Sequence, residues 1–341
     1  MADKILIWGA GAIGGTLGAY WARAGKNVLL VDRNSEHVSQ CRHGGISIEG
    51  PVEKFTKVIP ALTPNEIKGE YDCIVLAVKA LHTEEAMLAL TPHLAKDGFV
   101  LSAQNGLNEL TIAKHVGEKR TMGAFINFGA DWIEPGRILF GNRGAVVVGE
   151  ITPTTRNRTR KMHEVLKIFE PNAILTNNIW GYLWGKLAYG AMLFATALTN
   201  DSMTENFDDI NRQCVWISLG REVINVARAR GESPIGFNGF NPESFEEGNN
   251  YDEARLSIKG LAEFNRFTVK THSGVWRDLS IRHRKTEIDQ QIGIISELAQ
   301  EVGQKTPMID TLVQLIHDIE DGRRPQSYET LEVLIDKCPK I

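Results

Sequence analysis

The feature that most constrains this chain is a glycine-rich turn near its start, within the stretch KILIWGAGAIGG at 4–15. A short apolar run precedes the turn and apolar residues at helical spacing follow it, which predicts a strand, a tight turn and a helix. A second apolar run, NVLLV at 27–31, predicts another buried strand. This succession is the unit from which a mostly parallel, doubly wound α/β sheet is built.

Each glycine of the turn has its own task in a Rossmann-type dinucleotide site. Gly9 permits the tight turn, Gly11 lets the backbone approach a pyrophosphate, and Gly14 lets the helix pack close to the strand. The pyrophosphate would lie at the helix N-terminus, near Ala12 and Ile13, where free N–H groups and the helix dipole favour negative charge. These five residues are therefore predicted to bind a dinucleotide, the alternative being a glycine-rich turn in some other α/β sheet.

Two adjacent residues at the end of the second predicted strand favour different dinucleotides. Asp32 can accept hydrogen bonds from a ribose 2′-hydroxyl and would repel a 2′-phosphate, which favours NAD. Arg33 can stack on adenine or pair with a phosphate, which favours NADP. Because repulsion between like charges close together is hard to offset, we predict NAD, with NADP as the alternative.

Two further predicted strands end in polar residues. The run YDCIVLAVKA at 71–80 leads to Lys79, and the run GFVLSAQNGL at 98–107 leads to Asn105. Open α/β sheets bind ligands at the carboxyl ends of their strands, so both residues are candidates for a ligand site. A solvated lysine and a simple Asn-Gly turn are the structural alternatives.

From about residue 177 the pattern changes from strands to long amphipathic helices. We therefore predict a dinucleotide-binding domain over 1–176 and an all-helical substrate domain over 177–341. Residues 231–255 are rich in Gly, Asn, Pro and acids and show no helical period, which predicts a long loop or lid. The run TEIDQQIGIISELAQEVG at 286–303 predicts a helix, with Thr286 as its N-cap and Asp289 completing a capping box.

The segment IWGYLWGKLAYGAMLFATAL at 179–198 predicts a buried helix, and Lys186 is its one ionisable side chain. Burial tends to depress the pKa of a lysine and suits it to proton transfer. The alternative is that Lys186 extends its ammonium to the helix edge. Further on, Arg277 belongs to a cluster of basic and acidic residues at 277–289 that predicts either ion pairs on a solvated face or an anion site.

Four anchors together resemble the ketopantoate reductase (2-dehydropantoate 2-reductase) family. They are GAGAIGG near the start, AVKA at 77–80, QNGL at 104–107, and the pair WGKLAYG at 184–190 with RKTEID at 284–289. The resemblance covers nearly the whole chain in order and spacing. It implies a Rossmann-type domain followed by an all-α domain with the active site in the cleft between them, and hydride transfer between a nicotinamide cofactor and a 2-oxo or 2-hydroxy acid.

The resemblance also implies roles for individual residues. Lys186 matches the family's general acid, and Glu287 matches the glutamate that hydrogen-bonds the substrate. Asn105 matches the cleft asparagine near nicotinamide and substrate. Lys79 matches the cofactor lysine, and Arg33 matches the arginine that meets the 2′-phosphate.

The chain departs from the better-studied members beside the lysine. Gly190 and Phe194 stand one and two helical turns after it, where those members have asparagines, and Ser273 is the one hydroxyl left of a serine pair. These changes make the wall of the substrate site beside Lys186 more apolar. We therefore expect the substrate to be a bulkier or partly apolar 2-oxo acid rather than ketopantoate, or a 2-hydroxy acid that is oxidised. Gly190, Phe194, Ser273 and Arg277 are thus candidate substrate residues.

Composition excludes other classes of function. The formal charge of −4 gives no basic field for nucleic acid, and no apolar run is long enough for a membrane span. The four cysteines are scattered, which predicts neither disulfides nor a metal site and suits the cytoplasm.

A homodimer through the apolar C-terminal helices is a further expectation. An opine or β-hydroxyacid dehydrogenase, and a cofactor-binding sensor without turnover, are the alternative functions.

Overall fold

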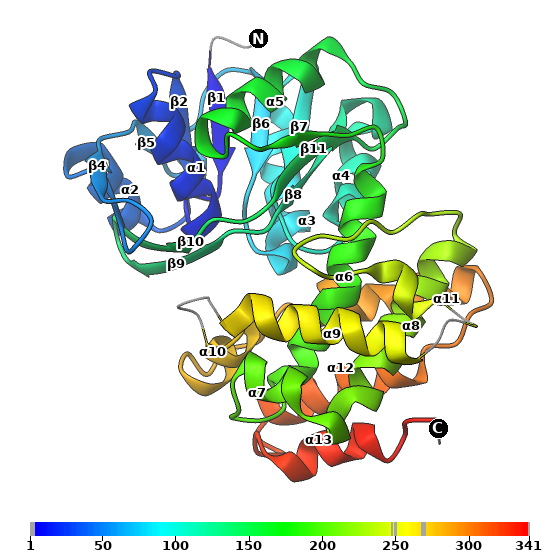
Figure 1. Ribbon diagram of the computed structural model, residues 1–341. Coiled ribbons are helices and arrows are strands. Elements are labelled where there is room, and N and C mark those ends of the chain that lie inside the picture. The colour runs from blue at the N-terminus through cyan, green and yellow to red at the C-terminus, as the bar shows by residue number, and fades with distance from the viewer. Residues whose placement is uncertain (1–3, 247, 249–250, 267–270, 340–341) are drawn as a thin grey trace. The chain divides into compact units, whose positions relative to one another are not determined.

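A computed structural model describes residues 4–246, 248, 251–266 and 271–339 of the chain. It divides the chain into two compact units, residues 1–179 and 180–341. Unit 1 holds the sheets and unit 2 is helical (Figure 1). Among the described residues, none of the helices is both long enough and apolar enough to cross a membrane.

Unit 1 is built on an eight-stranded sheet in the order β12-β11-β8-β7-β6-β1-β2-β5. All neighbouring strands pair in parallel except β8 and β11, which are antiparallel. This confirms the predicted doubly wound, mostly parallel α/β class. The strands are β1 (Ile5–Trp8), β2 (Val28–Val31), β5 (Ala61–Leu62), β6 (Tyr71–Leu76), β7 (Leu94–Ser102), β8 (Thr121–Ile126), β11 (Val146–Glu150) and β12 (Ile174–Leu175).

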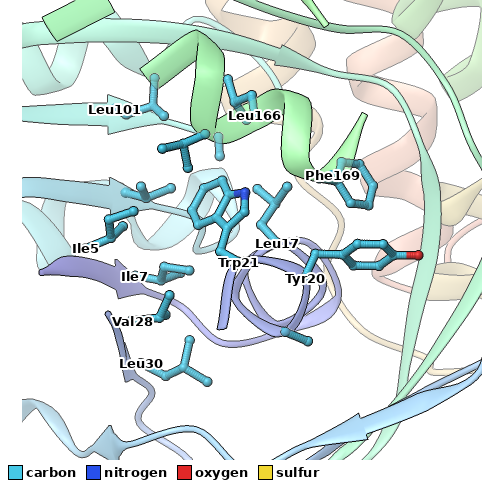
Figure 2. Packing of buried hydrophobic residues seen from close by; sticks show 14 of the residues in the cluster. Ile5, Ile7, Leu17, Tyr20, Trp21, Val28, Leu30, Leu101, Leu166 and Phe169 are labelled. Atoms are coloured by element: carbon cyan, nitrogen blue, oxygen red, sulfur yellow. The ribbon is translucent and has the colours of Figure 1, made fainter. Parts of the chain in front are cut away.

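Helices cover both faces of this sheet, so its central strands are apolar on both sides. Alternate residues of β1 enter different clusters: Ile5 and Ile7 pack with α1 and α5, whereas Leu6 and Trp8 pack with α3 and α4. Figure 2 shows the first cluster, in which Trp21 of α1 lies among strand residues and Leu166 of α5. The helices are α1 (Ala12–Arg23), α2 (Ser35–His43), α3 (Thr83–Leu90), α4 (Asn108–Val116) and α5 (Asn157–Phe169).

Unit 1 also contains a second, four-stranded sheet in the order β4-β3-β10-β9, which the sequence pattern did not reveal. Its strands are β3 (Ile46–Glu49), β4 (Phe55–Lys57), β9 (Gly129–Glu134) and β10 (Arg137–Asn142). The parallel pair β3·β10 joins segments 90 positions apart, as the register of Arg137 with Ser47 shows. The strands are short and only partly buried, so they lack a strong apolar period.

Unit 2 is helical throughout the part that the structure describes, apart from one isolated bridge between Phe237 and Phe240. Its first helix, α6, is followed along the chain by seven further α-helices in the described residues. They are α6 (Ile179–Thr196), α7 (Met203–Asp208), α8 (Gln213–Ala229), α9 (Tyr251–Arg266), α10 (Gly274–Ser280), α11 (Ile294–Glu301), α12 (Pro307–Glu320) and α13 (Tyr328–Ile335). A helical unit after a Rossmann-type unit is the predicted architecture, and it is confirmed.

The predicted long loop over 231–255 needs correction. Its last residues already belong to α9, and Pro242–Phe245 form a short 3-10 helix, η6. The segment is held on both sides: the Ile235 N–H donates to the Gly181 carbonyl at 2.8 Å, and the Asn241 N–H donates to the Ser257 hydroxyl at 2.8 Å. Phe240 is also buried. Aromatic anchors scattered without a helical period explain why the pattern resembled a free loop.

The helix predicted over 286–303 is interrupted at its start. A π-helical turn, η7 (Asp289–Gly293), precedes α11. The Thr286 hydroxyl does accept the Ile288 N–H at 3.2 Å, as an N-cap would. The second half of the predicted capping box is wrong, because the carboxylate that accepts the Thr286 N–H belongs to Glu320 of α12, at 2.7 Å.

Candidate active site

The glycine-rich turn joins β1 to α1 with the geometry that a dinucleotide turn requires. Gly9 has φ +100°, and a Cβ placed there would lie 2.7 Å from the backbone nitrogen of Val78. A Cβ on Gly14 would lie 2.0 Å from the Gly9 carbonyl oxygen and 2.9 Å from Ile7. A side chain at either position would force the backbone apart, so both glycines are needed for the turn and for the close packing of helix on strand.

Gly11 stands in a different environment, because a Cβ placed there would meet no atom within 4 Å. It is the N-cap of α1, it makes no side-chain cap, and the first turn of α1 carries no acidic residue. The N–H groups of this turn, at Ala12 and Ile13, are therefore at the positive end of the helix dipole with open space in front of Gly11. These features fit the pyrophosphate of a dinucleotide.

Asp32 follows β2 directly and is fixed by two backbone donors. One carboxylate oxygen accepts the Ala10 N–H at 2.9 Å, and the other accepts the Asn34 N–H at 2.9 Å. Charge-assisted bonds to both oxygens hold the side chain beside the glycine-rich turn. The carboxylate is therefore in place to meet a ribose hydroxyl, and it cannot turn away from a phosphate without losing these bonds.

Arg33 is exposed, and its guanidinium contacts His82, a residue that the sequence did not single out. The distance from Arg33 Nη2 to His82 Nε2 is 3.1 Å. Burial, together with the positive charge of Arg33, lowers the pKa of His82, and the charge of Lys79 acts in the same direction. Nε2 of His82 thus accepts a hydrogen bond from Arg33. Arg33, Lys79 and His82 form a basic group at the strand ends.

Lys79 and Asn105 lie three residues beyond the ends of β6 and β7, in loops rather than in the predicted strands. The two loops are tied together by the buried Gln104, whose amide donates to the Val78 carbonyl at 3.0 Å and to the Thr83 hydroxyl at 2.7 Å. The Asn105 carbonyl accepts from the Asn108 amide at 2.6 Å, while Asn105 itself is exposed. The loop backbone is therefore fixed, and Asn105 faces outward from it.

In unit 2, Lys186 lies on the one partly accessible stripe of α6. The accessible positions of the helix after Gly181 are Tyr182, Lys186, Gly190 and Leu193, at helical spacing. Lys186 is thus half-buried, between the two alternatives that the sequence left open, a buried lysine and one that extends its ammonium to the helix edge. A Cβ on Gly190 would meet no atom within 4 Å, so space is open one turn from the lysine.

Phe194 is only 2% exposed, and the accessible apolar surface at this level of α6 belongs to its neighbour Leu193. The expectation that Phe194 forms the exposed wall therefore has to be corrected in favour of Leu193. The cause is the 3.6-residue helical period, which turns the eighth residue after Lys186 about 80° away from the lysine, whereas the seventh residue, Leu193, is only about 20° away. A helical wheel of the accessible positions would have given the same result.

Ser273 and Arg277 lie at the start and in the last turn of α10. The buried Ser273 is the N-cap of this helix, and its hydroxyl accepts the Trp276 N–H at 3.2 Å. Nearby, the buried Asp278 receives Arg282 at 2.9 Å and Arg284 at 2.8 Å. Arg282 and Arg284 therefore form ion pairs, as one of the two predictions for this cluster had it. Arg277 is half-buried.

Glu287 lies between Thr286 and the π-helical turn η7 and is partly exposed. Glu320 of α12 accepts both the N–H and the hydroxyl of Thr286, each at 2.7 Å, with the same carboxylate oxygen. The side chain of Glu320 is 2% exposed. A buried carboxylate thus fixes the residue next to Glu287. The sequence signal for this contact, an H-x-x-E pair on a later helix, was too weak to find.

Within the described residues, no group of three or more His, Cys, Asp or Glu side chains is arranged to hold a metal ion. In unit 1 the turn, Asp32 and the basic group fit a dinucleotide. In unit 2 an ammonium group on an apolar helix and a supported carboxylate can donate a proton and accept hydrogen bonds.

Comparisons with known proteins show which chains this one is similar to. The family model described as ketopantoate reductase PanE/ApbA matches residues 5–153, and the model of its C-terminal part matches residues 178–320. A 2-dehydropantoate 2-reductase of Pyrococcus abyssi is 28% identical over 309 residues, covering 89% of this chain and 94% of that protein. One from Streptococcus pyogenes is 24% identical over 315 residues, covering 92% and 96%.

Solved structures share the fold over nearly the whole chain. D-mandelate dehydrogenase in complex with NADH and anilino(oxo)acetate has a TM-score of 0.81 at 24% identity, covering 94% of this chain and 98% of that one. A PanE/ApbA family ketopantoate reductase from Ralstonia eutropha JMP134 has a TM-score of 0.78 at 24% identity, covering 94% and 99%.

The fold and the dinucleotide turn define an NAD(P)-dependent oxidoreductase with a Rossmann-type unit and a helical unit. Its family follows from the two family models, which together match both units. The chain belongs to the ketopantoate reductase family. This confirms the resemblance inferred from the four sequence anchors.

Proposed function

We propose that the protein is an NAD-dependent oxidoreductase that interconverts a 2-oxo acid and a 2-hydroxy acid with a bulky or partly apolar side chain. The observation that carries the proposal is the accessible stripe of α6, where Lys186 is followed by the open space at Gly190 and by Leu193. Those positions offer no polar side chain to a hydroxylated substrate. A site of this kind favours an apolar substituent.

Lys186 is the proposed general acid in the direction of reduction. Its ammonium would donate a proton to the carbonyl oxygen of the substrate, and in the reverse direction the neutral amine would accept it. Glu287 is proposed to accept a hydrogen bond from the substrate and so to orient it. Asn105 is proposed to act near the nicotinamide and the substrate, and Ser273 and Arg277 remain candidate substrate residues through the resemblance.

A nicotinamide dinucleotide would supply the hydride when the 2-oxo acid is reduced and would take it up when the 2-hydroxy acid is oxidised. In unit 1, Gly9, Gly11 and Gly14 would hold the pyrophosphate on α1, with Ala12 and Ile13 donating backbone N–H groups. Asp32 would accept from the ribose 2′-hydroxyl, which supports NAD over NADP. The presence of NADH in the two D-mandelate dehydrogenase structures supports the same choice, and the anilino(oxo)acetate in one of them supports an apolar substituent.

The test is a substrate panel combined with two pairs of variants. We expect kcat/KM for 2-oxo acids with aryl or branched alkyl side chains to exceed that for ketopantoate. Lys186→Ala should lower kcat about 100-fold or more, while Lys259→Ala, an exposed lysine of α9, should leave kcat unchanged. Glu287→Gln should raise KM and lower kcat, and its control is Glu263→Gln, also exposed on α9.

Three results would contradict the proposal. Unchanged turnover in Lys186→Ala removes the general acid. A requirement for an amine co-substrate identifies an opine dehydrogenase instead. Cofactor binding without hydride transfer to or from any acid of the panel favours a sensor. For the cofactor, a preference for NADPH above about tenfold in kcat/KM, roughly 1.4 kcal/mol, would overturn the choice of NAD.

A further inference from the structure

His317 of α12 is connected to the chain on both sides of Glu287. It contacts Asp289 directly and reaches Thr286 through Glu320. Its Nε2 lies 2.8 Å from a carboxylate oxygen of Asp289, and its Nδ1 lies 3.2 Å from Glu320 Oε2. The other oxygen of Glu320 holds Thr286. Glu287 therefore has Thr286 before it and Asp289 shortly after it, and both lead to the same imidazole.

The geometry requires a protonated imidazole. Carboxylate oxygens accept hydrogen bonds and have none to donate, so both ring nitrogens of His317 must donate. A neutral imidazole has one N–H, and its second nitrogen would direct a lone pair at a carboxylate. Only the imidazolium satisfies Asp289 and Glu320 at once.

Burial makes the charge of His317 important for Glu320. The Glu320 side chain is 2% exposed, whereas His317 is 28% and Asp289 58% exposed. A buried carboxylate is stable when it is paired and hydrogen-bonded. If Nδ1 of His317 loses its proton, its lone pair faces the lone pairs of the Glu320 carboxylate. The attraction between the two side chains then becomes a repulsion. We expect Glu320, and with it Thr286, to shift in response.

The charged groups that act on the pKa of His317 are Asp289 from η7 and Glu320 from α12 itself. Burial alone lowers the pKa of His317, but the hydrogen bonds and charges of these two carboxylates outweigh it and raise the pKa above its ordinary value. The other elements packed on α12 place their polar groups near its start: Glu222 of α8 reaches Met308 and Ile309, and Lys337, just after α13, reaches Thr311. Asp318 is paired with Arg323 and Arg324.

We propose that His317 is a positioning residue whose imidazolium, through Glu320 and Asp289, holds the turn that carries Glu287 in its active conformation. The inference rests on the proposed role of Glu287. The protonated network fixes Thr286 and the first residue of η7, and so limits the movement of the residue between them. Deprotonation of His317 leaves one N–H for two carboxylates, so one of the two contacts is lost. Turnover then falls because small displacements of an orienting group are costly.

The experiment compares pH profiles of kcat for the full-length protein and two variants. His317→Lys keeps a positive charge up to about pH 10 and should extend full turnover to a pH at which the wild type has already declined. His317→Gln is neutral at every pH and should have a kcat about five- to tenfold lower in the neutral range. The kcat of His317→Gln should also lack the decline with rising pH that deprotonation of His317 causes in the wild type.

Glu320→Gln is a third variant that separates positioning from mere stability. An amide oxygen can still accept from Thr286, but the loss of charge lowers the pKa of His317, so the decline in kcat should move to lower pH. A profile of His317→Gln that follows the wild type in kcat and in its pH of decline would overturn the proposal. So would a loss of activity in each variant that follows its loss of thermal stability with no change in the pH profile.

The outcomes also distinguish this inference from the proposed function. If Glu287→Gln retains normal kcat and KM, the role of Glu287 is wrong and the positioning of its turn has no catalytic meaning. If Glu287→Gln loses turnover while the three variants keep the wild-type profile, Glu287 is confirmed as functional and the positioning role of His317 alone fails.

Discussion

A carboxylate oxygen of Asp32 accepts the backbone N–H of Ala10 at 2.9 Å, which ties the acidic end of β2 to the glycine-rich turn after β1. The second oxygen accepts from the Asn34 backbone. A negative charge is thereby fixed where the adenosine ribose of a dinucleotide is expected. This bond gives Asp32, the proposed determinant of cofactor choice, a fixed position.

We expect Asp32→Asn to shift the ratio of kcat/KM for NADH over NADPH towards NADPH by about tenfold or more, roughly 1.4 kcal/mol. Asparagine keeps one acceptor for the backbone but removes the charge that repels a 2′-phosphate. Arg33→Ala is the matched variant and should shift the ratio in the opposite direction. Equal ratios in Asp32→Asn and the wild type would show that Asp32 does not select the cofactor.

We expect the contact between Arg33 and His82 to make this preference depend on pH. Burial and the charge of Arg33 lower the pKa of His82, so His82 is neutral at pH 7 and accepts from the guanidinium. As the pH falls through this lowered pKa, His82 gains a proton, stops accepting, and adds a positive charge beside Arg33. The ratio of NADPH to NADH turnover should therefore rise in acid.

His82→Gln is the control for the prediction on pH, because an amide oxygen accepts from Arg33 but does not titrate. A 2′-phosphate itself loses charge near pH 6, and this effect is common to both proteins. The difference between the wild-type and His82→Gln ratios, measured from pH 8 to pH 5.5, isolates the histidine. Parallel curves would assign no role to it.

Two of the three glycines of α6, Gly185 and Gly190, should respond oppositely to alanine. A Cβ on Gly190 meets open space, so Gly190→Ala should raise the free energy of unfolding by about 0.5–1 kcal/mol through helix propensity. A Cβ on Gly185 would lie 2.2 Å from the Ile235 carbonyl oxygen, so Gly185→Ala should lower it by about 1–3 kcal/mol. Urea unfolding measures both. Destabilisation by Gly190→Ala would show that the space beside Lys186 is filled.

Glu222 of α8 predicts a dependence of stability on pH. Its two carboxylate oxygens accept the N–H groups of Met308 and Ile309, at 2.9 and 2.8 Å, at the start of α12. Burial raises the pKa of Glu222 to about 7, against the lowering effect of these bonds. Since the folded pKa lies above the unfolded one, the stabilising contribution is full below about pH 4.5 and is lost as the pH rises through 7.

Glu222→Gln, which does not titrate, tests this dependence. The free energy of unfolding of the wild type should fall by about 2 kcal/mol between pH 5 and pH 8, and the variant should show a smaller fall. His317, whose pKa is also raised, contributes a loss of the same sign, so some dependence remains in the variant. Identical pH dependence in both proteins would contradict the role of Glu222.

The sequence predicted the elements whose signals are local. The apolar run of β1, the glycines at 9, 11 and 14, and the helical period of α6 each lie within a few residues and follow the periods of strand and helix. The family resemblance added the order of the anchors. The weakly apolar strands β3, β4, β9 and β10 carry no such period, and the sequence analysis did not find them.

What the sequence by itself determined is the type of the elements that have a local apolar period, the dinucleotide turn and the identity of the ionisable residues, because neighbouring residues encode them. Only the tertiary structure decided how those residues are held. Ala10 and Asp32 are 22 positions apart, Arg33 and His82 are 49 apart, and Thr286 and Glu320 are 34 apart. Contacts at such separations arise when elements pack, and they leave no period in the chain. They fix the charge beside the cofactor turn and support the turn of Glu287.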